Sequence, residues 1–321
     1  MSAIRLDNLR KHYRTGFWMR QFEAVKGISL TVEQGESFGF VGPNGAGKTS
    51  TIKVLAGLQS ATSGDAFING ISCSNPRSRE HLGFLPERPY FYTHLTAKEV
   101  LRLYGALFGM KGQVLTDRIQ SLLARVEMTQ FADVALGKYS KGMLQRVGLC
   151  QTLLHDPDVI LLDEPMSGLD PVGRAMVRDI ILEEKQAGRT VFFCSHVLSD
   201  VETICQRVAI LVKGEIRSMG AIADLVTAAD SRMVCTFQMV EDYPVESLNL
   251  PTDQQPTAKA DLWTLVLAKS DFALFLRDNV QKITIVDVHQ ERKSLEDLFV
   301  DMVLEKSPHT SSNTNTLGVL A

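Results

Sequence analysis

The residues best suited to chemistry form one glycine-rich stretch near the N-terminus. It reads Gly42-Pro43-Asn44-Gly45-Ala46-Gly47-Lys48-Thr49, and Ser50 follows. Glycines let backbone N–H groups converge on an anion without interference from Cβ atoms, and a lysine at this spacing reaches the β- and γ-phosphates of a nucleotide. The threonine hydroxyl after the lysine is suited to bind Mg²⁺. The stretch therefore predicts a phosphate-binding loop in which residues 42–50 contact a nucleotide.

The segments on either side of this loop decide between a phosphate site and a chance match. The apolar run Ser37–Val41 before the loop predicts a buried strand, and Thr49–Leu58 after it has the pattern of a helix. A helix N-terminus adds partial positive charge where phosphates would lie. Because a chance glycine-rich turn would lack both flanking elements, we interpret the loop as a nucleotide site.

Two acidic residues follow a second apolar run. Val159–Leu162 has the composition of a fully buried parallel strand, and Asp163 and Glu164 come directly after it. Sheets of α/β proteins place their ligands at the carboxyl ends of their strands. Asp163 is therefore predicted to hold Mg²⁺, and Glu164 to polarise an attacking water as general base. Either acid alone would also fit a solvated strand end.

Two further polar residues come at the ends of predicted strands. His196 follows Thr190–Cys194, and Glu87 follows a strand that stops at Pro86. His196 is suited to donate to a γ-phosphate, or else to cap a helix, and Glu87 is placed to reach the metal or the water. Together with Lys48, these side chains supply the parts that phosphoryl transfer needs. The predicted catalytic residues are Lys48, Glu164 and His196, and the predicted metal ligands are Thr49, Glu87 and Asp163.

An aromatic and basic stretch, Tyr13–Phe22, lies between two predicted strands. Aromatic rings commonly line ligand pockets, so Tyr13 is predicted to stack on adenine. The alternative is a strand aromatic that covers a sheet edge. Phe17 and Trp18 are expected to pack or to contact a partner, and we assign no chemistry to them.

The elements that must position these residues begin with strands. Ile4–Leu6 and Ile28–Val32 alternate apolar and polar residues, and a turn at Ser63–Asp65 is expected to lead into a strand at Ala66–Ile68.

Residues 88–137 are predicted to be mainly helical, as a block inserted between two halves of a sheet. Thr96 and Glu99 have capping-box spacing at the start of one helix, and a second helix is expected from Thr116 to Met128. Ser140 suits the N-cap of the helix after that.

The following part of the chain alternates helices and strands. Pro171 suits the first position of a helix. Ser199 and Glu202 have the spacing to cap a short helix, and a hairpin is expected at Lys213-Gly214.

The pattern changes after Gly220. The segments beyond it predict a small α+β module with no catalytic constellation, in which residues 241–259 form a loop and Ser294 caps the last helix. Ser307–Thr316 is rich in Ser, Thr and Asn, which predicts disorder.

Composition sets limits on the class of protein. The chain has 321 residues, 45% of them hydrophobic and 22% charged, with a net charge of −3, so we expect no nucleic-acid partner. The five cysteines lack C-x-x-C spacing and are read as small apolar residues in a reducing compartment. No signal-peptide core and no apolar run of roughly 20 residues is present, so we expect a soluble, cytoplasmic chain.

The order of these motifs resembles that of the nucleotide-binding subunit of an ATP-binding-cassette (ABC) transporter. Gly42–Thr49 resembles the family's Walker A motif, Val159–Glu164 its Walker B motif with catalytic glutamate, and His196 its switch histidine. Tyr139–Met143 lies where the family has its LSGGQ signature, and Ser167–Asp170 matches its D-loop.

The resemblance implies an α/β fold of the P-loop NTPase ABC-cassette type. The cassette would span residues 1–220, with a mixed core sheet, an antiparallel β subdomain and a helical subdomain at about 88–155. A small α+β extension would follow at 221–305, and a disordered tail at 306–321. The region 221–305, ending in Ser294–Phe299, is similar to the short C-terminal extension of single-cassette subunits of the ABC-2 export type, which includes drug and sodium exporters.

The resemblance also implies cofactors and partners. ATP and Mg²⁺ would be sandwiched in a head-to-tail homodimer or heterodimer of cassettes. Ser140 and Gly142 of one copy would close on the γ-phosphate bound by Lys48 of the other, with Asp170 nearby. A separate multi-span membrane permease would hold the chain peripherally on the inner face of the cell membrane.

Two departures from the family pattern are visible. Glu87 stands where the family usually has Gln, which adds negative charge beside the triphosphate. The signature carries Lys141 for Gly and Met143 for Gln. We hypothesise that Lys141 offsets part of the charge of Glu87 by facing the partner's ATP.

Two other functions are open at this stage. One is a soluble ABC ATPase acting on nucleic acid or the ribosome; the segment between Lys48 and Ser140 lacks the sustained heptads of chromosome-type members, and the chain has one cassette where translation factors have two. The other is a regulatory protein that binds nucleotide without turnover, which the intact set of Lys48, Asp163, Glu164 and His196 argues against.

Overall fold

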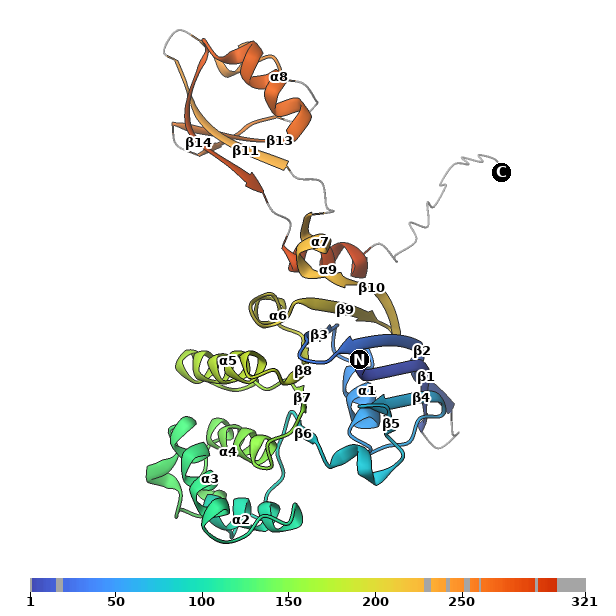
Figure 1. The fold of residues 1–321 in the computed structure, drawn as a ribbon. Coiled ribbons are helices and arrows are strands. Elements are labelled where there is room, and N and C mark those ends of the chain that lie inside the picture. The colour runs from blue at the N-terminus through green and yellow to red at the C-terminus, as the bar shows by residue number, and fades with distance from the viewer. Residues whose placement is uncertain are drawn as a thin grey trace, which may run out of the picture. The chain divides into compact units, whose positions relative to one another are not determined.

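The structure is a computed structural model that describes residues 2–15, 20–227, 232–240, 243–250, 255–259, 261–291 and 294–304. The chain forms two compact units, residues 1–224 and 225–321 (Figure 1). The segment Ser307–Thr316, predicted to be disordered, lies outside the described residues, as do Phe17 and Trp18.

An antiparallel sheet of four strands forms one side of the larger unit, in the order β2-β1-β4-β5. Its strands are β1 (Ser2–Thr15), β2 (Arg20–Glu33), β4 (Ser63–Ile68) and β5 (Ile71–Ser72). The turn predicted at Ser63–Asp65 is wrong, because these residues begin β4. Gly64 has a φ of 76°, and a Cβ there would lie 2.1 Å from the carbonyl oxygen of Asn8. Glycine therefore lets a bulged strand continue where the sequence suggests a turn.

A six-stranded sheet forms the centre of the larger unit, in the order β10-β9-β3-β8-β7-β6. Its strands are β3 (Ser37–Val41), β6 (Leu82–Leu85), β7 (Val159–Asp163), β8 (Thr190–Ser195), β9 (Arg207–Val212) and β10 (Glu215–Ala221). All pairs are parallel except β9 with β10. Every residue of β3, β7 and β8 is buried, as their apolar composition predicts. Parallel pairing brings the carboxyl ends of β3, β6, β7 and β8 to one edge, where the predicted site residues begin.

Helices cover both faces of this sheet (Figure 1). They are α1 (Lys48–Leu55) on one side and α5 (Pro171–Gln186) and α6 (Leu198–Ile204) on the other. The cap predicted for α6 is wrong, because Ser199 lies inside the helix and Val197 is the N-cap. The hydroxyl of Ser195 accepts the backbone N–H of Val197 at 3.0 Å, which supplies a partner at this helix start.

A helical layer lies beside the β6 edge of the sheet and contains α2 (Ala97–Leu107), α3 (Gly112–Arg125) and α4 (Lys141–Leu153) (Figure 1). The predicted capping box of Thr96 and Glu99 is confirmed, and Ser140 caps α4 by accepting the N–H of Met143. Helix α3 starts four residues before the predicted Thr116 and ends three before Met128. Short 3₁₀ turns connect these parts at Pro76–Arg79 (η1), Thr129–Phe131 (η2) and Leu136–Lys138 (η3).

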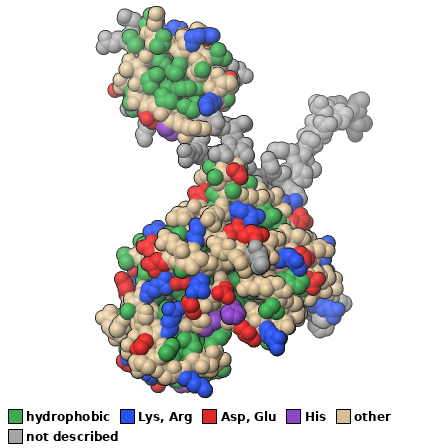
Figure 2. Space-filling view, viewed as in Figure 1, with side chains coloured by type: hydrophobic (Ala, Val, Ile, Leu, Met, Phe, Trp, Pro, Cys, Tyr) green, Lys and Arg blue, Asp and Glu red, His purple; other side chains and the backbone are tan. Residues whose placement is uncertain are grey.

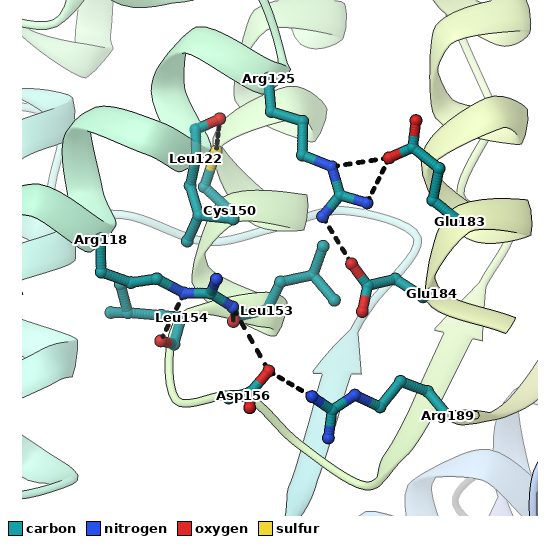
Figure 3. A network of polar contacts seen from close by, with 10 residues as sticks. All are labelled: Arg118, Leu122, Arg125, Cys150, Leu153, Leu154, Asp156, Glu183, Glu184 and Arg189. Atoms are coloured by element: carbon teal, nitrogen blue, oxygen red, sulfur yellow. Dashed lines mark hydrogen bonds and ion pairs between the residues drawn. The ribbon is translucent and has the colours of Figure 1, made fainter. Parts of the chain in front are cut away.

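Ion pairs tie the helical layer to the rest of the larger unit (Figure 3). Arg125 at the end of α3 points at Glu183 and Glu184 of α5 and pairs with both. Arg118 of α3 and Arg189 before β8 both reach Asp156. The orientation of α3 relative to α5 is therefore fixed partly by charge, in addition to apolar packing.

The smaller unit contains a four-stranded antiparallel sheet in the order β12-β13-β11-β14. Its elements are β11 (Arg232–Met239), η4 (Val245–Ser247), β12 (Thr257–Lys259), β13 (Leu262–Ala268), α8 (Lys269–Asn279), β14 (Ile283–Glu291) and α9 (Leu295–Leu304), preceded by α7 (Ile222–Thr227). Phe237 and Phe275 are fully buried in its core. The segment 241–259, predicted to be a loop, contains β12, which pairs with β13. The predicted cap of α9 is confirmed, since Ser294 Oγ accepts the N–H of Asp297 at 3.2 Å.

Candidate nucleotide-binding site

A cavity of about 270 Å³ opens at the carboxyl edge of the six-stranded sheet. It is lined by Tyr13, Phe22, Ala24, Asn44, Gly45, Ala46, Gly47, Lys48, Thr49, Ser50, Glu87, Glu164, Ser167 and His196. Residues far apart in the sequence, from the glycine-rich loop to the end of β8, therefore meet around one space. Most of the residues predicted to bind or to hydrolyse a nucleotide belong to this set.

The glycine-rich loop joins β3 to α1, as the sequence predicts. Gly47 has a φ of 110°, and a Cβ at this position would lie 2.4 Å from the carbonyl oxygen of Ala24. Only glycine fits this close approach, which brings the loop against β2. Lys48 is the first residue of α1, and its buried ammonium group donates to the carbonyl of Gly42 at 2.6 Å and of Pro43 at 3.3 Å. The lysine is thus held inside the loop, and among the described residues its nearest charged partner is Glu164 at 3.9 Å.

Asp163 lies at the end of β7 and is 2% exposed. Its burial, and next the charge of Glu164, raise the pKa of its carboxyl group from 3.8 to about 6, while a hydrogen bond with Thr49 opposes this. Its Oδ1 atom is buried and has no hydrogen-bond partner among the described residues. An orphaned carboxylate oxygen beside a threonine hydroxyl is a donor set that fits Mg²⁺. Glu87 lines the cavity wall and could supply a third oxygen ligand.

Glu164 connects the two sides of the cavity. Its backbone has a φ of 51°, a left-handed conformation that costs of order 1–3 kcal/mol in a residue other than glycine. Its Oε2 atom lies 2.8 Å from Nδ1 of His196 and accepts from the hydroxyl of Ser195 at 3.5 Å. The structure therefore brings Lys48, Glu164 and His196 together, although they come from three separate elements.

Tyr13 lies on β1 and lines the cavity beside Ser50. Its hydroxyl oxygen is 2.5 Å from Oε1 of Gln59 and 3.2 Å from Oγ of Ser50. These hydrogen bonds connect the phenol to Ser50 in the first turn of α1 and to Gln59, which follows this helix. The Tyr13 side chain is part of the cavity wall, where its ring could stack on an adenine.

Two residues of the cavity wall had no role in the sequence interpretation. They are Phe22 and Ala24. Phe22 is opposite Tyr13 in the β1–β2 pairing. Knowing which residues of the two strands pair would have placed Phe22 beside Tyr13. The amino-acid pattern does not reveal this pairing, so the sequence analysis missed Phe22.

Ser140, Gly142 and Asp170 do not line this cavity. They line a second space of about 510 Å³, together with Lys141 and Met143. Asp170 is the N-cap of α5 and accepts the N–H of Gly173 at 2.8 Å. Lys141 donates to the hydroxyl of Ser167 at 3.1 Å, so its charge is directed at the D-loop segment of its own chain. Within one copy, the predicted phosphate contacts are thus split between two surfaces.

An apolar groove of about 630 Å³ lies between β6 and the helical layer. Its walls include Pro89, Tyr90, Phe91 and Tyr104, and Tyr90 is 87% exposed. Glu87 lines both this groove and the cavity of the glycine-rich loop. One carboxylate is therefore shared by the two spaces.

This combination of fold and site defines a P-loop ATPase cassette with an inserted helical layer. The family model described as ABC transporter matches residues 25–167. An uncharacterized ABC transporter ATP-binding protein of Synechocystis is 41% identical over 97% of this chain and 87% of its own length. The chain belongs to this family, the ATP-binding proteins of ABC transporters.

Other relatives support the same assignment. An uncharacterized ABC transporter ATP-binding protein of Bacillus subtilis is 35% identical over 94% of this chain and 99% of its own length. A solved structure described as the ATP binding subunit of an ABC transporter superposes with a TM-score of 0.64 and 27% identity, covering 71% of this chain and 93% of the other. The predicted ABC-cassette fold is confirmed, and the chain is an ATP-binding ATPase subunit of a transporter. No helix among the described residues is long and apolar enough to span a membrane.

Proposed function

We propose that this subunit binds ATP with Mg²⁺ in the cavity of the glycine-rich loop and hydrolyses it to power export through a membrane partner. The observation that carries the proposal is the meeting of Lys48, Glu164 and His196 around one cavity, with Asp163 buried beside Thr49. Phosphoryl transfer needs a lysine on the phosphates, a carboxylate on the metal and a group that orients the water.

Lys48 and the backbone of residues 42–50 bind the phosphates. The ammonium group now donates to two loop carbonyls. Phosphate oxygens are stronger acceptors because they are charged, so a bound nucleotide takes over these donors. Thr49, Asp163 and Glu87 hold Mg²⁺, which would neutralise part of the triphosphate charge when bound.

Glu164 positions and deprotonates the attacking water. The side chain of Glu164 is 12% exposed and lies beside Lys48 and His196. A protonated imidazole donates from both nitrogens, so His196 can hold Glu164 through Nδ1 and present Nε2–H to the γ-phosphate. Tyr13 packs its ring against the adenine.

Two cassettes share each ATP. Ser140, Gly142 and Asp170 face a space separate from the glycine-rich loop of their own chain. A head-to-tail partner, a second copy or a related cassette, would supply the same residues from outside. This arrangement explains why a complete set of phosphate contacts is not assembled in one copy.

The membrane partner is a multi-span permease that places a short segment in the apolar groove. Tyr90 is 87% exposed there, and large exposed apolar patches mark interaction sites. Figure 2 shows acidic and basic side chains interspersed on the visible face of the larger unit. That face offers no broad basic surface for nucleic acid, and the relatives reported above are described as transporter proteins.

The outward direction of transport is supported by the C-terminal region. The region 221–305, ending in Ser294–Phe299, is similar to the extension of ABC-2 export subunits. The subunit would then work at the inner face of the cell membrane, attached through its permease.

Two substitutions test the assignment of the cavity. Lys48→Ala is expected to lose most of its affinity for ATP, and Glu164→Gln to keep this affinity while turnover falls by at least 100-fold, because it keeps the shape and loses the base. Equilibrium binding and phosphate release measure the two effects, with the exposed Glu80→Gln as control. Near-normal hydrolysis by Glu164→Gln would remove Glu164 from this role.

The membrane partner is tested by co-purification from detergent extracts. Wild type is expected to carry a multi-span membrane protein with it, and Tyr90→Asp to lose that protein because the change puts a charge in the apolar groove. Tyr243→Asp, on an exposed tyrosine of the smaller unit, is the matched control. Equal recovery of the membrane protein with both variants would show that the groove is not the docking site.

A further inference from the structure

The β1–β2 pairing places two aromatic rings at the mouth of the nucleotide cavity. Tyr13 and Phe22 are directly opposite each other in the antiparallel register. Opposite residues of an antiparallel pair project from the same face of the sheet. Both side chains line the cavity, beside Ala24 and the glycine-rich loop.

The two rings differ in how the protein holds them. The phenol of Tyr13 is bound at its hydroxyl by Gln59 and Ser50, and the ammonium group of Lys11 lies 5.2 Å from the ring centroid. Phe22 is 52% exposed, and its ring stacks on no other aromatic ring among the described residues. Tyr13 is therefore a fixed part of the wall, whereas Phe22 has apolar surface that a ligand can still cover.

The polar groups beside these rings are already engaged. Ser50 and Gln59 contact the Tyr13 hydroxyl, and Lys11 donates to the carbonyl of Ser60 at 2.7 Å. The wall near the rings thus offers a ligand mainly apolar and π surface. A flat base would be recognised there by stacking area more than by hydrogen bonds.

We propose that Phe22 is a second base-stacking residue, which forms with Tyr13 a two-ring platform for the purine of the nucleotide. The proposal rests on the proposed placement of the triphosphate on residues 42–50 and goes beyond it by assigning the base contact. Because stacking tolerates changes at the edge of the base, the platform should select purine over pyrimidine triphosphates and discriminate weakly between ATP and GTP.

The test separates the base from the phosphates by using two ligands. Affinities of wild type and Phe22→Ala are measured for Mg²⁺-ATP and for Mg²⁺-tripolyphosphate, which has the charge but no base. Phe22→Ala is expected to weaken ATP binding about 10-fold and to leave tripolyphosphate binding unchanged, since one aromatic–base stack accounts for roughly that factor. Phe22→Trp, which keeps an aromatic face, is expected to retain the affinity for ATP.

Two further variants control the measurement. Ile71→Ala removes a partly exposed apolar side chain from the same antiparallel sheet, away from the cavity, and should change neither affinity. Lys48→Ala should weaken both ligands. If Lys48→Ala changes neither affinity, the phosphate assignment fails, whatever Phe22 does.

The results for Phe22→Ala decide the proposal by themselves. An unchanged affinity for ATP would overturn it, because the ring would then make no contact with the base. An equal loss for ATP and tripolyphosphate would overturn it too, because the ring would then act on the shape of the loop.

Discussion

Glu87 gives the site one more negative charge than the family pattern. It lines the cavity, and its charge contributes to the raised pKa of Asp163. Glu87 and Glu164 therefore line the cavity in which we propose that a tetravalent anion binds, and the carboxyl group of Asp163 interacts electrostatically with both. Such a cluster repels nucleotide without metal and attracts Mg²⁺.

We predict that Glu87→Gln moves two affinities in opposite directions. Removing the charge should tighten ATP binding several-fold in the presence of a chelator. It should also raise the Mg²⁺ concentration that half-saturates the ATP complex by several-fold. Isothermal titration with and without Mg²⁺ measures both affinities, with Glu80→Gln as control. If the affinity for metal-free ATP and the affinity for Mg²⁺ both rose, or both fell, this role for Glu87 would be contradicted.

Asp163 makes the stability of the empty protein depend on pH. Its pKa is raised from 3.8 to about 6 by burial. A carboxyl group whose pKa is higher in the folded state destabilises the fold above that pKa, and the cost disappears as the pH falls below its unfolded value. We predict that Asp163→Asn, without nucleotide or metal, raises the free energy of unfolding by about 3 kcal/mol at pH 7.5.

At pH 5 the same substitution should gain only about half as much, since part of the wild-type carboxyl is already protonated. Urea unfolding at the two pH values measures the difference. A loss of stability that is equal at both pH values would mean that burial of the ionised Asp163 carries no cost.

The places of the candidate catalytic residues in the fold could be predicted from the sequence because each residue lies next to a strong local signal. Lys48 follows a glycine pattern, and Asp163, Glu164 and His196 follow apolar runs whose carboxyl ends must meet in a parallel sheet. Phe22 carries no such signal. Its place in the cavity wall depends on the register of two long strands, and register is a property of the pairing.

At the scale of elements, the contact of α3 with α5 shows what charge adds to packing. The guanidinium of Arg125 pairs with Glu183 and with Glu184, whose side chain is only 13% exposed (Figure 3). Removing one partner of a largely buried ion pair leaves the other charge poorly solvated.

We predict that Arg125→Ala lowers the free energy of unfolding by about 1–3 kcal/mol. Arg178→Ala removes an exposed pair with Asp179 from α5 and should change it by less than about 0.5 kcal/mol. Combining Arg125→Ala with Glu184→Ala should cost less than the sum of the two single changes. Additive effects in chemical denaturation would show that the pair is not coupled.

Element boundaries depart from the sequence pattern where tertiary contacts decide. Helix α6 begins without the Ser199 cap because Ser195, at the end of a strand, supplies the bond instead. Strand β4 runs through Ser63–Asp65 because β1 pairs with it there, across a bulge that Gly64 permits. Propensity favours a turn at that point, and pairing with a neighbouring strand overrides it.

At the scale of the whole molecule, the chain is an ATP-binding subunit in which the two surfaces proposed to contact phosphate line separate spaces of one copy. The glycine-rich loop opens into one cavity, and Ser140, Gly142 and Asp170 line another. The sequence alone could not separate these two surfaces, because it shows the order of motifs but not the distance between them. The separation is the physical reason to expect a second cassette.

The most direct test of this account is the molar mass of purified Glu164→Gln in solution. With Mg²⁺-ATP the mass should double relative to the ATP-free protein, because slow hydrolysis leaves the nucleotide trapped between two copies. It should stay monomeric with ADP, and adding Ser140→Arg should prevent the ATP-dependent dimer. A protein that stays monomeric in saturating Mg²⁺-ATP, or that dimerises equally with Ser140→Arg, would contradict the claim that two copies close on a shared nucleotide.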